Sequence, residues 1–300
     1  MLKLLALFCI ALSGVATADS VSDPVQTTCR RIAAKLASVS LHDCLAINPV
    51  DSGYRSEKGT PLLIKEYPPL AQRQPHARIL LLGGIHGDEY SAVSIMFKWM
   101  RILEQHHSGL FHWQIAPLVN PDGLLQKKSR RVNANGVDLN RNFAFNHPHM
   151  TSIDYWQTRT NRNPRRYPGG QPESEKETLW IKHLIQRFQP DAIITVHAPY
   201  GIVDFDGPKD PPLHLGPLHL HLLGTYPGSL GNYAGLQLAI PVVTVELPYA
   251  GIMPGNAETS RIWTDMIRWL LKRFPQPPEP APQNIQAMSM SSAAPIASDP

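Results

Sequence analysis

Residues 78–89 read RILLLGGIHGDE, and this stretch decides the fold of the 300-residue chain. Its first half is a short apolar run that ends in two glycines, which is typical of a strand buried inside a sheet. From residue 90 to residue 104, apolar side chains recur at helical spacing and share one face. The stretch therefore predicts a buried strand, a tight loop that carries His86 and Glu89, and a helix that covers the strand.

The same alternation of strands and helices continues along the chain. It predicts an α/β fold with a mixed, largely parallel twisted sheet that has helices on both faces. Residues 120–123 read NPDG, a strong turn signal, and residues 143–172, rich in Asn, Arg, Pro and His, predict a long ordered loop. We expect strands over residues 62–67, 78–82, 112–119, 191–197 and 242–247, and helices over residues 25–37, 90–104, 172–188 and 260–274.

The two ends of the chain differ in composition from its middle. Residues 1–18 contain Lys3, an apolar run and a small-residue cleavage pattern, ATA, which together predict a signal peptide rather than a membrane anchor. We expect residues 19–60 to form an N-terminal leader region, residues 61–274 the main domain, and residues 275–300 a disordered tail. Whether residues 19–60 are an inhibitory prosegment or part of the fold stays open.

The composition limits the classes of function. Hydrophobic residues make up 43% of the chain and charged residues 17%, so the chain can form a sizeable core. The net charge is +4, and the basic run at 127–131 has no interleaved aromatic residues, which argues against a nucleic-acid surface. Cys9 leaves with the signal peptide. Cys29 and Cys44 are an even pair in an exported chain and predict a disulfide, with two buried thiols as the alternative.

Three potential metal ligands follow the ends of predicted strands. His86 and Glu89 are three residues apart where a loop becomes a helix, so both side chains can converge on one ion. His197 ends a later strand, and sites in open α/β sheets form outside such ends. Two histidines and one glutamate with an open position are typical of catalytic zinc. For the His-x-x-Glu pair alone, a solvated helix start is the alternative.

Two further sets of residues suit catalysis. Glu246 lies near the end of an apolar run, where burial raises the pKa of a carboxyl group and suits it to moving protons. A structural ion pair with an arginine is the alternative. In the sequence DLNRN at 138–142, Arg141 offers a planar fork of donors for a carboxylate and Asn140 adds a neutral donor. An ordinary solvated loop is the alternative there.

Taken together, these motifs resemble the zinc carboxypeptidase superfamily, the carboxypeptidase A-like enzymes, over roughly residues 60–272. Each motif is modest alone, but their joint order and spacing are specific. The pieces are HGDE at 86–89, NPDG at 120–123, GVDLNRNF at 136–143, Ser174-Glu175, His197 and TVEL at 244–247.

The resemblance implies a catalytic role for the main domain and one Zn²⁺ per chain. Asp138 would orient the ring of the first zinc-binding histidine. A glutamate would act as general base, and two side chains would bind the terminal carboxylate of a peptide substrate. The implied residues are His86, Glu89 and His197 for zinc, Glu246 as general base, and Asn140 and Arg141 for the carboxylate.

The family also uses an arginine to stabilise the oxyanion and a mobile tyrosine to close the site. The resemblance assigns the first role to Arg131 in preference to Arg130, and the second to Tyr226 with Tyr233 as the rival. The segment 230–231 falls where the family sets side-chain preference. Its Leu-Gly carries no charge, which argues against a preference for basic side chains.

Among the family branches, GVDLNRNF and the segment YPGSLG at 226–231 look most like bacterial murein peptide amidases. Those enzymes cut between γ-D-glutamate and meso-diaminopimelate in cell-wall peptides. The signal peptide would place this chain in the periplasm, so we expect wall remodelling or turnover rather than the cytoplasmic recycling usual for such enzymes. We expect a peptide substrate, no nucleic acid, and no membrane span in the mature chain.

Three other functions stay open. The first is a metallocarboxypeptidase that removes C-terminal residues from ordinary peptides or proteins. The second is a related branch that removes acyl groups from amino acids, which the full Asn-Arg-Asn-Phe and Thr-Val-Glu-Leu set disfavours. The third is a catalytically dead wall-binding protein, which the complete set of chemical residues argues against.

Overall fold

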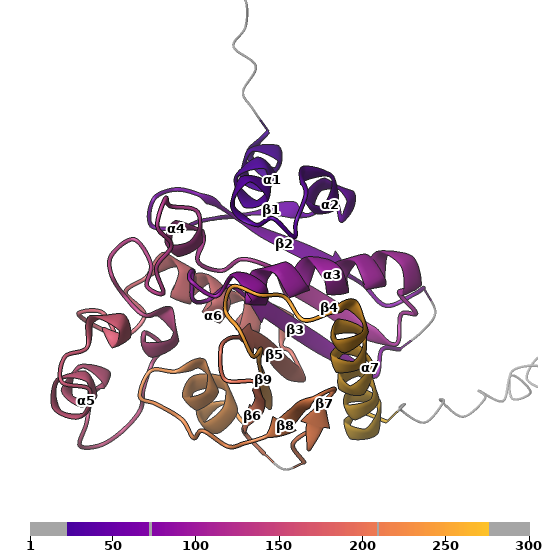
Figure 1. Ribbon diagram of the computed structural model, residues 1–300. Coiled ribbons are helices and arrows are strands. Elements are labelled where there is room, and N and C mark those ends of the chain that lie inside the picture. The colour runs from indigo at the N-terminus through magenta and orange to yellow at the C-terminus, as the bar shows by residue number, and fades with distance from the viewer. Residues whose placement is uncertain (1–22, 72–73, 209, 276–300) are drawn as a thin grey trace, which may run out of the picture.

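The computed structural model describes residues 23–71, 74–208 and 210–275. The predicted signal peptide at 1–18 and residues 276–300 of the predicted tail lie outside these ranges. Within the described residues, a nine-stranded sheet forms the centre, with helices against both of its faces (Figure 1). No helix in this part of the chain is both long enough and apolar enough to cross a membrane.

The strands of the sheet are β1 (Val50–Arg55), β2 (Pro61–Tyr67), β3 (Ala77–Gly83), β4 (Phe111–Ala116), β5 (Ala192–His197), β6 (Ile202–Asp206), β7 (His214–Leu215), β8 (Leu218–Leu220) and β9 (Val242–Glu246). Their order is β1-β2-β4-β3-β5-β9-β6-β8-β7. The central strands β4, β3, β5 and β9 run parallel, whereas β1, β2 and β6 pair antiparallel. The predicted mixed sheet is confirmed, with its parallel part at the centre. The strands β1, β6, β7 and β8 are not predicted from the sequence.

Helices cover both faces because the central strands are apolar on both sides. The described α-helices are α1 (Pro24–Lys35), α2 (Leu41–Ala46), α3 (Tyr90–His106), α4 (Pro121–Leu124), α5 (Ser152–Arg159), α6 (Lys176–Phe188) and α7 (Asn256–Arg273). In β3, Ile79 and Leu81 pack in the cluster that contains residues of α3 and α7. Leu80 and Leu82, which point to the opposite face, pack in the cluster around Trp180 of α6. The alternation along one strand therefore supplies two hydrophobic cores.

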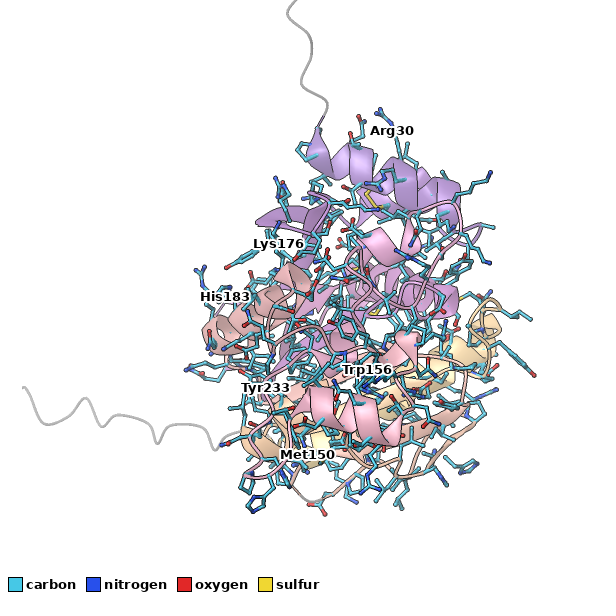
Figure 2. The ribbon with its side chains drawn as sticks, turned by 90° about the vertical axis from the view of Figure 1, so that its left-hand side faces the viewer. Arg30, Met150, Trp156, Lys176, His183 and Tyr233 are labelled. Atoms are coloured by element: carbon cyan, nitrogen blue, oxygen red, sulfur yellow. A yellow bond between two sulfur atoms is a disulfide. The ribbon has the colours of Figure 1, made fainter. Side chains whose placement is uncertain are left out.

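The N-terminal residues take part in the first of these cores. A disulfide joins Cys29–Cys44, as predicted, and links α1 to α2 (Figure 2, yellow). Ile32, Leu36 and Ile47 are buried in the same cluster as α3, and β1 pairs with β2. The described part of the leader region, from residue 23 onward, therefore belongs to the fold of the domain.

The predicted long loop at 143–172 contains α5 and a 3-10 turn at Pro164–Arg166, so the loop prediction is wrong for that part. α5 begins with a capping box in which the side chains of Thr151 and Asp154 accept from each other's backbone N–H groups. Ser152 is the one buried residue of α5. The helix consequently lacks the apolar stripe that reveals a helix in a sequence. It projects from the body of the molecule at the left of Figure 1.

Candidate active site

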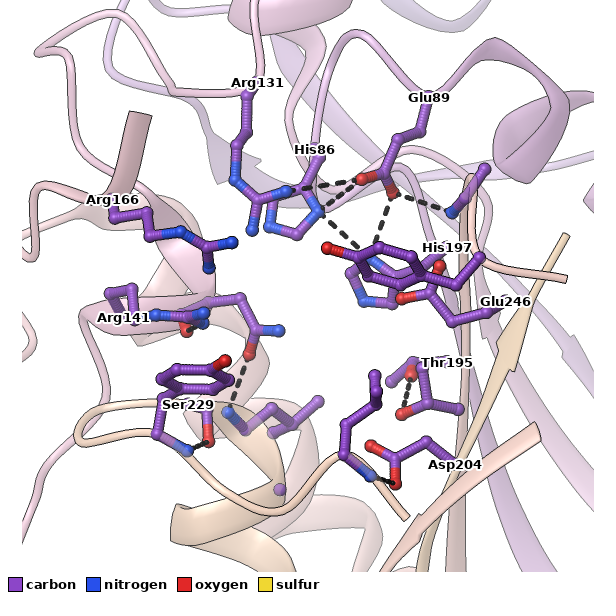
Figure 3. Close-up of a pocket in the computed structure, with 18 of the residues that line it drawn as sticks. His86, Glu89, Arg131, Arg141, Arg166, Thr195, His197, Asp204, Ser229 and Glu246 are labelled. Atoms are coloured by element: carbon purple, nitrogen blue, oxygen red, sulfur yellow. Dashed lines mark hydrogen bonds and ion pairs between the residues drawn. The ribbon is translucent and has the colours of Figure 1, made fainter. Parts of the chain in front are cut away.

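A cavity of about 390 Å³ opens at the carboxyl ends of the central strands. His86 and Glu89 line it from the loop after β3, His197 from the end of β5, and Glu246 from the end of β9 (Figure 3). Ligands of open α/β sheets bind beyond the carboxyl ends of the strands. The cavity is therefore where such a fold places its active site.

The three predicted metal ligands converge in this cavity. Nδ1 of His86 lies 2.8 Å from Oε1 of Glu89, and Nδ1 of His197 lies 3.0 Å from both Oε2 of Glu89 and Nδ1 of His86. All three side chains are buried. Their ligand atoms lie within 4.8 Å of one another, close enough to share a single ion.

The hydrogen-bond pattern shows why this donor set suits a cation. Nε2 of His86 lies 3.1 Å from Oδ1 of Asp138. With the ring N–H on Nε2, toward the Asp138 carboxylate, Nδ1 presents a lone pair to Glu89 and to His197, and without a metal a proton on Nδ1 can bridge to Glu89 instead. Electron-pair donors that face one another at such distances repel unless a cation lies between them. Imidazole nitrogen and carboxylate oxygen are ligands of Zn²⁺, so the residues fit a zinc ion with one open position.

The charges around the triad also favour a cation. Burial raises the pKa of Glu89, but His86 and His197 outweigh burial and lower that pKa below its ordinary value. Burial and Arg131 lower the pKa of His86, but Glu89 and Asp138 outweigh them and raise it. Without a metal, His86 therefore holds a proton more readily than usual. Metal binding must displace that proton.

The loop that carries His86 is enclosed by backbone. A Cβ atom on Gly87 would overlap the backbone of Gly123, so no other residue fits there without movement. The side-chain amide of Asn120 donates to the carbonyl oxygen of Ile85 at 3.2 Å, and its Oδ1 accepts from the N–H of Gly123 at 2.8 Å. The NPDG turn therefore starts α4 and also holds the HGDE loop in place.

Glu246 pairs in register with His197 across the two neighbouring strands. Its side chain is buried, and its Oε2 has no hydrogen-bond partner within the described residues. Burial raises the pKa of Glu246 above its ordinary value. Glu89 adds to this, and His197 opposes it. A buried, unpaired carboxylate oxygen beside a metal triad can accept a proton and return it. The alternative, an ion pair with an arginine, does not form in the described part of the chain.

Arg131 lines the cavity beside the triad, and the lining does not include Arg130. Nε of Arg131 donates to Oδ2 of Asp138 at 2.9 Å, and its Nη1 lies 3.5 Å from Oε1 of Glu89. Asp138 thus contacts both Arg131 and His86, the second of these as the resemblance implies. The guanidinium group is held where it can face negative charge that develops next to the triad.

Asn140, Arg141 and Tyr226 also line the cavity. Figure 3 shows Arg141 across the cavity from Glu246. The guanidinium carbon of Arg141 lies 4.3 Å from the centroid of the Tyr226 ring. Oδ1 of Asn140 accepts from the N–H of Leu230 at 2.8 Å, which leaves the amide N–H groups of Asn140 for a ligand. Tyr233 is buried and does not line the cavity. Of the two candidate tyrosines, Tyr226 is therefore the one at the cleft.

Positive charge is concentrated beside Arg141. Burial, together with Arg131 and Arg166, lowers the pKa of Arg141 to about 10, although Asp138 opposes this change. Arg166 lies 5.7 Å from the centroid of the Tyr226 ring, on the 3-10 turn of the inserted segment. Neither Arg141 nor Arg166 has an ion pair with a carboxylate in the described part of the chain. Their donors therefore suit the carboxylate of a ligand.

Five charged residues that line the cleft are missing from the sequence-based site prediction, namely Asp88, Arg165, Arg166, Asp204 and Asp206. Asp88 and Arg165 form an ion pair with each other at 2.7 Å. Arg166 lies in the segment that is expected to be a loop. Asp204 and Asp206 lie on β6, and Oδ1 of Asp204 accepts from the N–H of Leu223 at 2.9 Å. The alternation in IVDFD at 202–206 is a signal from which a strand with an acidic face could have been predicted.

Comparison with known proteins agrees with this site. The family model for zinc carboxypeptidases matches residues 55–203. Murein peptide amidase A of Escherichia coli strain K12 is 30% identical over 227 residues, which cover 72% of this chain and 88% of that protein. The crystal structure of the murein-tripeptide amidase from Escherichia coli O157 has a TM-score of 0.51 and 25% sequence identity, and the match covers 72% of this chain and 89% of that one.

The fold is also shared with carboxypeptidase A from Helicoverpa armigera. That structure is 17% identical with a TM-score of 0.56, and the match covers 75% of this chain and 68% of that one. This structural match shows that the chain has the carboxypeptidase A-like fold. Membership of the family is shown by the match to the family model and by the 30% identity to murein peptide amidase A. With the metal-binding triad of His86, Glu89 and His197 in place, the chain belongs to the zinc carboxypeptidase family of peptidases and amidases.

Proposed function

We propose that the chain hydrolyses an amide bond next to a terminal carboxylate, and that its substrate is the γ-D-glutamyl-meso-diaminopimelate bond of murein peptides. One observation carries the proposal. A single cleft holds a metal triad, a buried carboxylate with an unpaired oxygen, and two donor side chains suited to a carboxylate. The 30% identity to murein peptide amidase A supports murein peptides as the substrate class.

Arg141 and Asn140 would position the substrate. Diaminopimelate at the end of a murein tripeptide presents a free carboxylate beside the scissile amide. The guanidinium group of Arg141 can bind that carboxylate with two parallel hydrogen bonds, and the free N–H groups of Asn140 can add another. The ring of Tyr226 against Arg141 limits the movement of the guanidinium group. Holding the amide in this way lowers the entropic part of the barrier.

The remaining residues supply the chemistry. A zinc ion at the triad would, when bound, act as a Lewis acid and lower the pKa of water to near neutrality. Glu246 would take the proton from the attacking water and pass it to the departing amine, because its Oε2 is free to do so. Arg131, fixed by Asp138, would donate to the oxygen that becomes negative as the carbonyl carbon is attacked.

We further propose that the chain acts in the periplasm. The pattern of residues 1–18, outside the described part, predicts export. The Cys29–Cys44 disulfide supports an oxidising compartment, where such bonds persist. In that compartment the chain would contribute to wall remodelling or turnover.

The test is incubation of purified mature protein with L-Ala-γ-D-Glu-meso-diaminopimelate, followed by mass spectrometry. We expect release of free diaminopimelate, and we expect His86→Ala, which lacks one ligand, to lose both bound zinc and activity. Release of C-terminal residues from ordinary L-peptides but not from the murein tripeptide would support a metallocarboxypeptidase instead. A zinc-loaded protein that binds the tripeptide but cleaves no peptide would support a wall-binding role.

A further inference from the structure

A second cavity lies between helix α6 and the face of the sheet that this helix covers. Its volume is about 300 Å³, and residues of β1, β2, β3, β4 and α6 line it. Arg78 lines it near the start of β3, whereas His86 of the active cleft follows the end of that strand. Figure 2 shows His183, another lining residue, at the edge of the molecule. The two cavities share no lining residue, so they are separate places on the protein.

The residues of β3 and β4 explain why this cavity has a polar border. Leu80 points toward α6 and packs in the cluster around Trp180. The next residue on that side of the strand, toward its start, is Arg78. On the neighbouring strand β4, Gln114 pairs with Leu80 and His112 pairs with Arg78. The apolar face of the sheet therefore ends beneath α6, and polar side chains border the cavity.

Four residues that line this cavity each have a buried polar atom without a hydrogen-bond partner in the described part of the chain. The atoms are Nε of Arg78, Oε1 of Gln114, Nε1 of Trp180 and Nδ1 of His183. The side chain of Trp180 is fully buried. Leaving a buried donor or acceptor without a partner is costly, and Oε2 of Glu246 in the active cleft is another such atom. Their gathering around one cavity indicates a ligand.

The charges around this cavity favour an anion. The guanidinium group of Arg78 forms no ion pair within the described residues, although Oδ2 of Asp191 accepts from its backbone N–H at 2.7 Å. Arg187 adds a second positive charge to the lining. Glu66 is the one carboxylate in the lining, and it already lies 2.6 Å from Nε2 of His112. Because a guanidinium group forms strong charge-assisted hydrogen bonds with carboxylates, the cavity suits a ligand that carries one.

The remaining lining indicates the body of the ligand. The indole N–H of Trp180 can only donate, and Oε1 of Gln114 can only accept, so a secondary amide could satisfy both. A volume of about 300 Å³ is at the lower end of the range for small-molecule sites, which favours a single residue over a long peptide. Apolar contacts are available from Tyr54, Ile64, Leu184 and Phe188.

We propose that this cavity binds a small N-acylated amino acid with an apolar side chain. Arg78 would bind its carboxylate, Trp180 its amide oxygen and Gln114 its amide N–H. Ile64 and Leu184 would pack against its side chain. The proposal does not depend on the proposed function, because it concerns no residue of the active cleft.

The test follows the indole N–H signals of the wild-type protein by NMR. No tryptophan lines the active cleft, so the signal of Trp180 reports on the second cavity, and the variant Trp180→Phe identifies it. N-acetyl-L-leucine should shift this signal saturably, with a Kd below about 1 mM. N-acetyl-L-leucinamide, which has the same body without the negative charge, should bind at least about tenfold more weakly.

Three variants locate the effect. Arg78→Gln should remove the preference for the acid over the amide, because it removes the charge that binds the carboxylate. Arg30→Gln is the matched control and should keep the preference, because Arg30 is exposed, contacts Gln26 and lines neither cavity. Arg141→Gln, which alters only the active cleft, should leave the shift of the Trp180 signal unchanged. A failure of the proposed function is thereby distinguished from a failure of this site.

The wild-type protein alone can overturn the proposal. Absence of a saturable shift of the Trp180 signal with either ligand, as expected if water alone satisfies the buried atoms, would do so. Equal affinities for the acid and the amide would also do so, as would a preference that persists in a folded Arg78→Gln variant, with folding checked by its melting temperature. If that variant does not fold, Gln114→Glu replaces it, and its added negative charge should weaken binding of the acid more than binding of the amide.

Discussion

Asp138 offers a sharp test of how the metal site is supported. Its side chain is fully buried, and its carboxylate lies 3.1 Å from Nε2 of His86 and 2.9 Å from Nε of Arg131. In the variant Asp138→Asn, a single side-chain oxygen must serve three donors, because Oδ1 of Asp138 also accepts from the N–H of Asn140 at 3.0 Å. Arg131 keeps its charge and retains the oxygen, so the amide NH₂ faces His86 and the N–H of Asn140. The ring then gains by accepting at Nε2 and carrying its proton on Nδ1, the atom that should bind the metal.

This change of tautomer sets the expected size of the effect. Loss of the partner that orients a metal-binding histidine typically weakens metal affinity by ~10–100-fold, or about 1.4–2.7 kcal/mol. We therefore expect the Kd for zinc of Asp138→Asn to rise by that factor, while the ligands themselves stay in place. Chelator competition with the purified variant measures this directly.

Asp122→Asn is the matched control for Asp138→Asn. Asp122 is also buried, but it accepts from Oγ of Ser56 at 2.9 Å and from the N–H of Lys58 at 2.8 Å. Within the described residues, no hydrogen bond or ion pair joins it to the triad. Its variant should lose stability without losing zinc affinity. Unchanged zinc affinity in Asp138→Asn, or an equal loss in both variants, would refute the reasoning.

Two further changes test other parts of the molecule. Glu246→Gln should keep its zinc, because no ligand is altered, but lose about 10²–10⁴-fold in kcat/KM on the tripeptide; near-normal turnover would exclude Glu246 as the base. The double variant Cys29→Ala and Cys44→Ala removes the disulfide, which closes a loop with a sequence separation of 15. It should lower the free energy of unfolding, measured in urea, by ~3 kcal/mol, while kcat/KM stays within about twofold. An unchanged urea concentration at the midpoint of unfolding would contradict this prediction.

The metal site could be predicted because its residues follow the strongest signals in the sequence. β3 and β5 are apolar on both faces, so their ends are clear, and His86 and His197 follow from those ends. Glu89 follows from its spacing to His86. The roles of Asn140 and Arg141 came from the resemblance, and the structure places both side chains in the same cleft as the triad.

That Asp204 and Asp206 face the cleft could not be predicted, because their strand β6 is short and its pairing partner β9 is remote in the sequence. Residues 202–206 alternate between apolar and acidic side chains, but a polar face normally points to solvent. Only the antiparallel pairing with β9 turns Asp204 and Asp206 toward the cleft. α5 was missed for a related reason, since its one local signal is the capping box of Thr151 and Asp154.

The register of β5, β9 and β6 has a consequence for protein engineering. The level of His197 and Glu246 would carry the chemistry, and Asp204 lies opposite Thr244, two residues from that level along β9. Because the two levels are separate positions on a rigid sheet, substitutions at 204, 206 and 231 can be combined in a library without altering a metal ligand. Such a library would show which of these three positions can vary while the protein keeps its bound zinc.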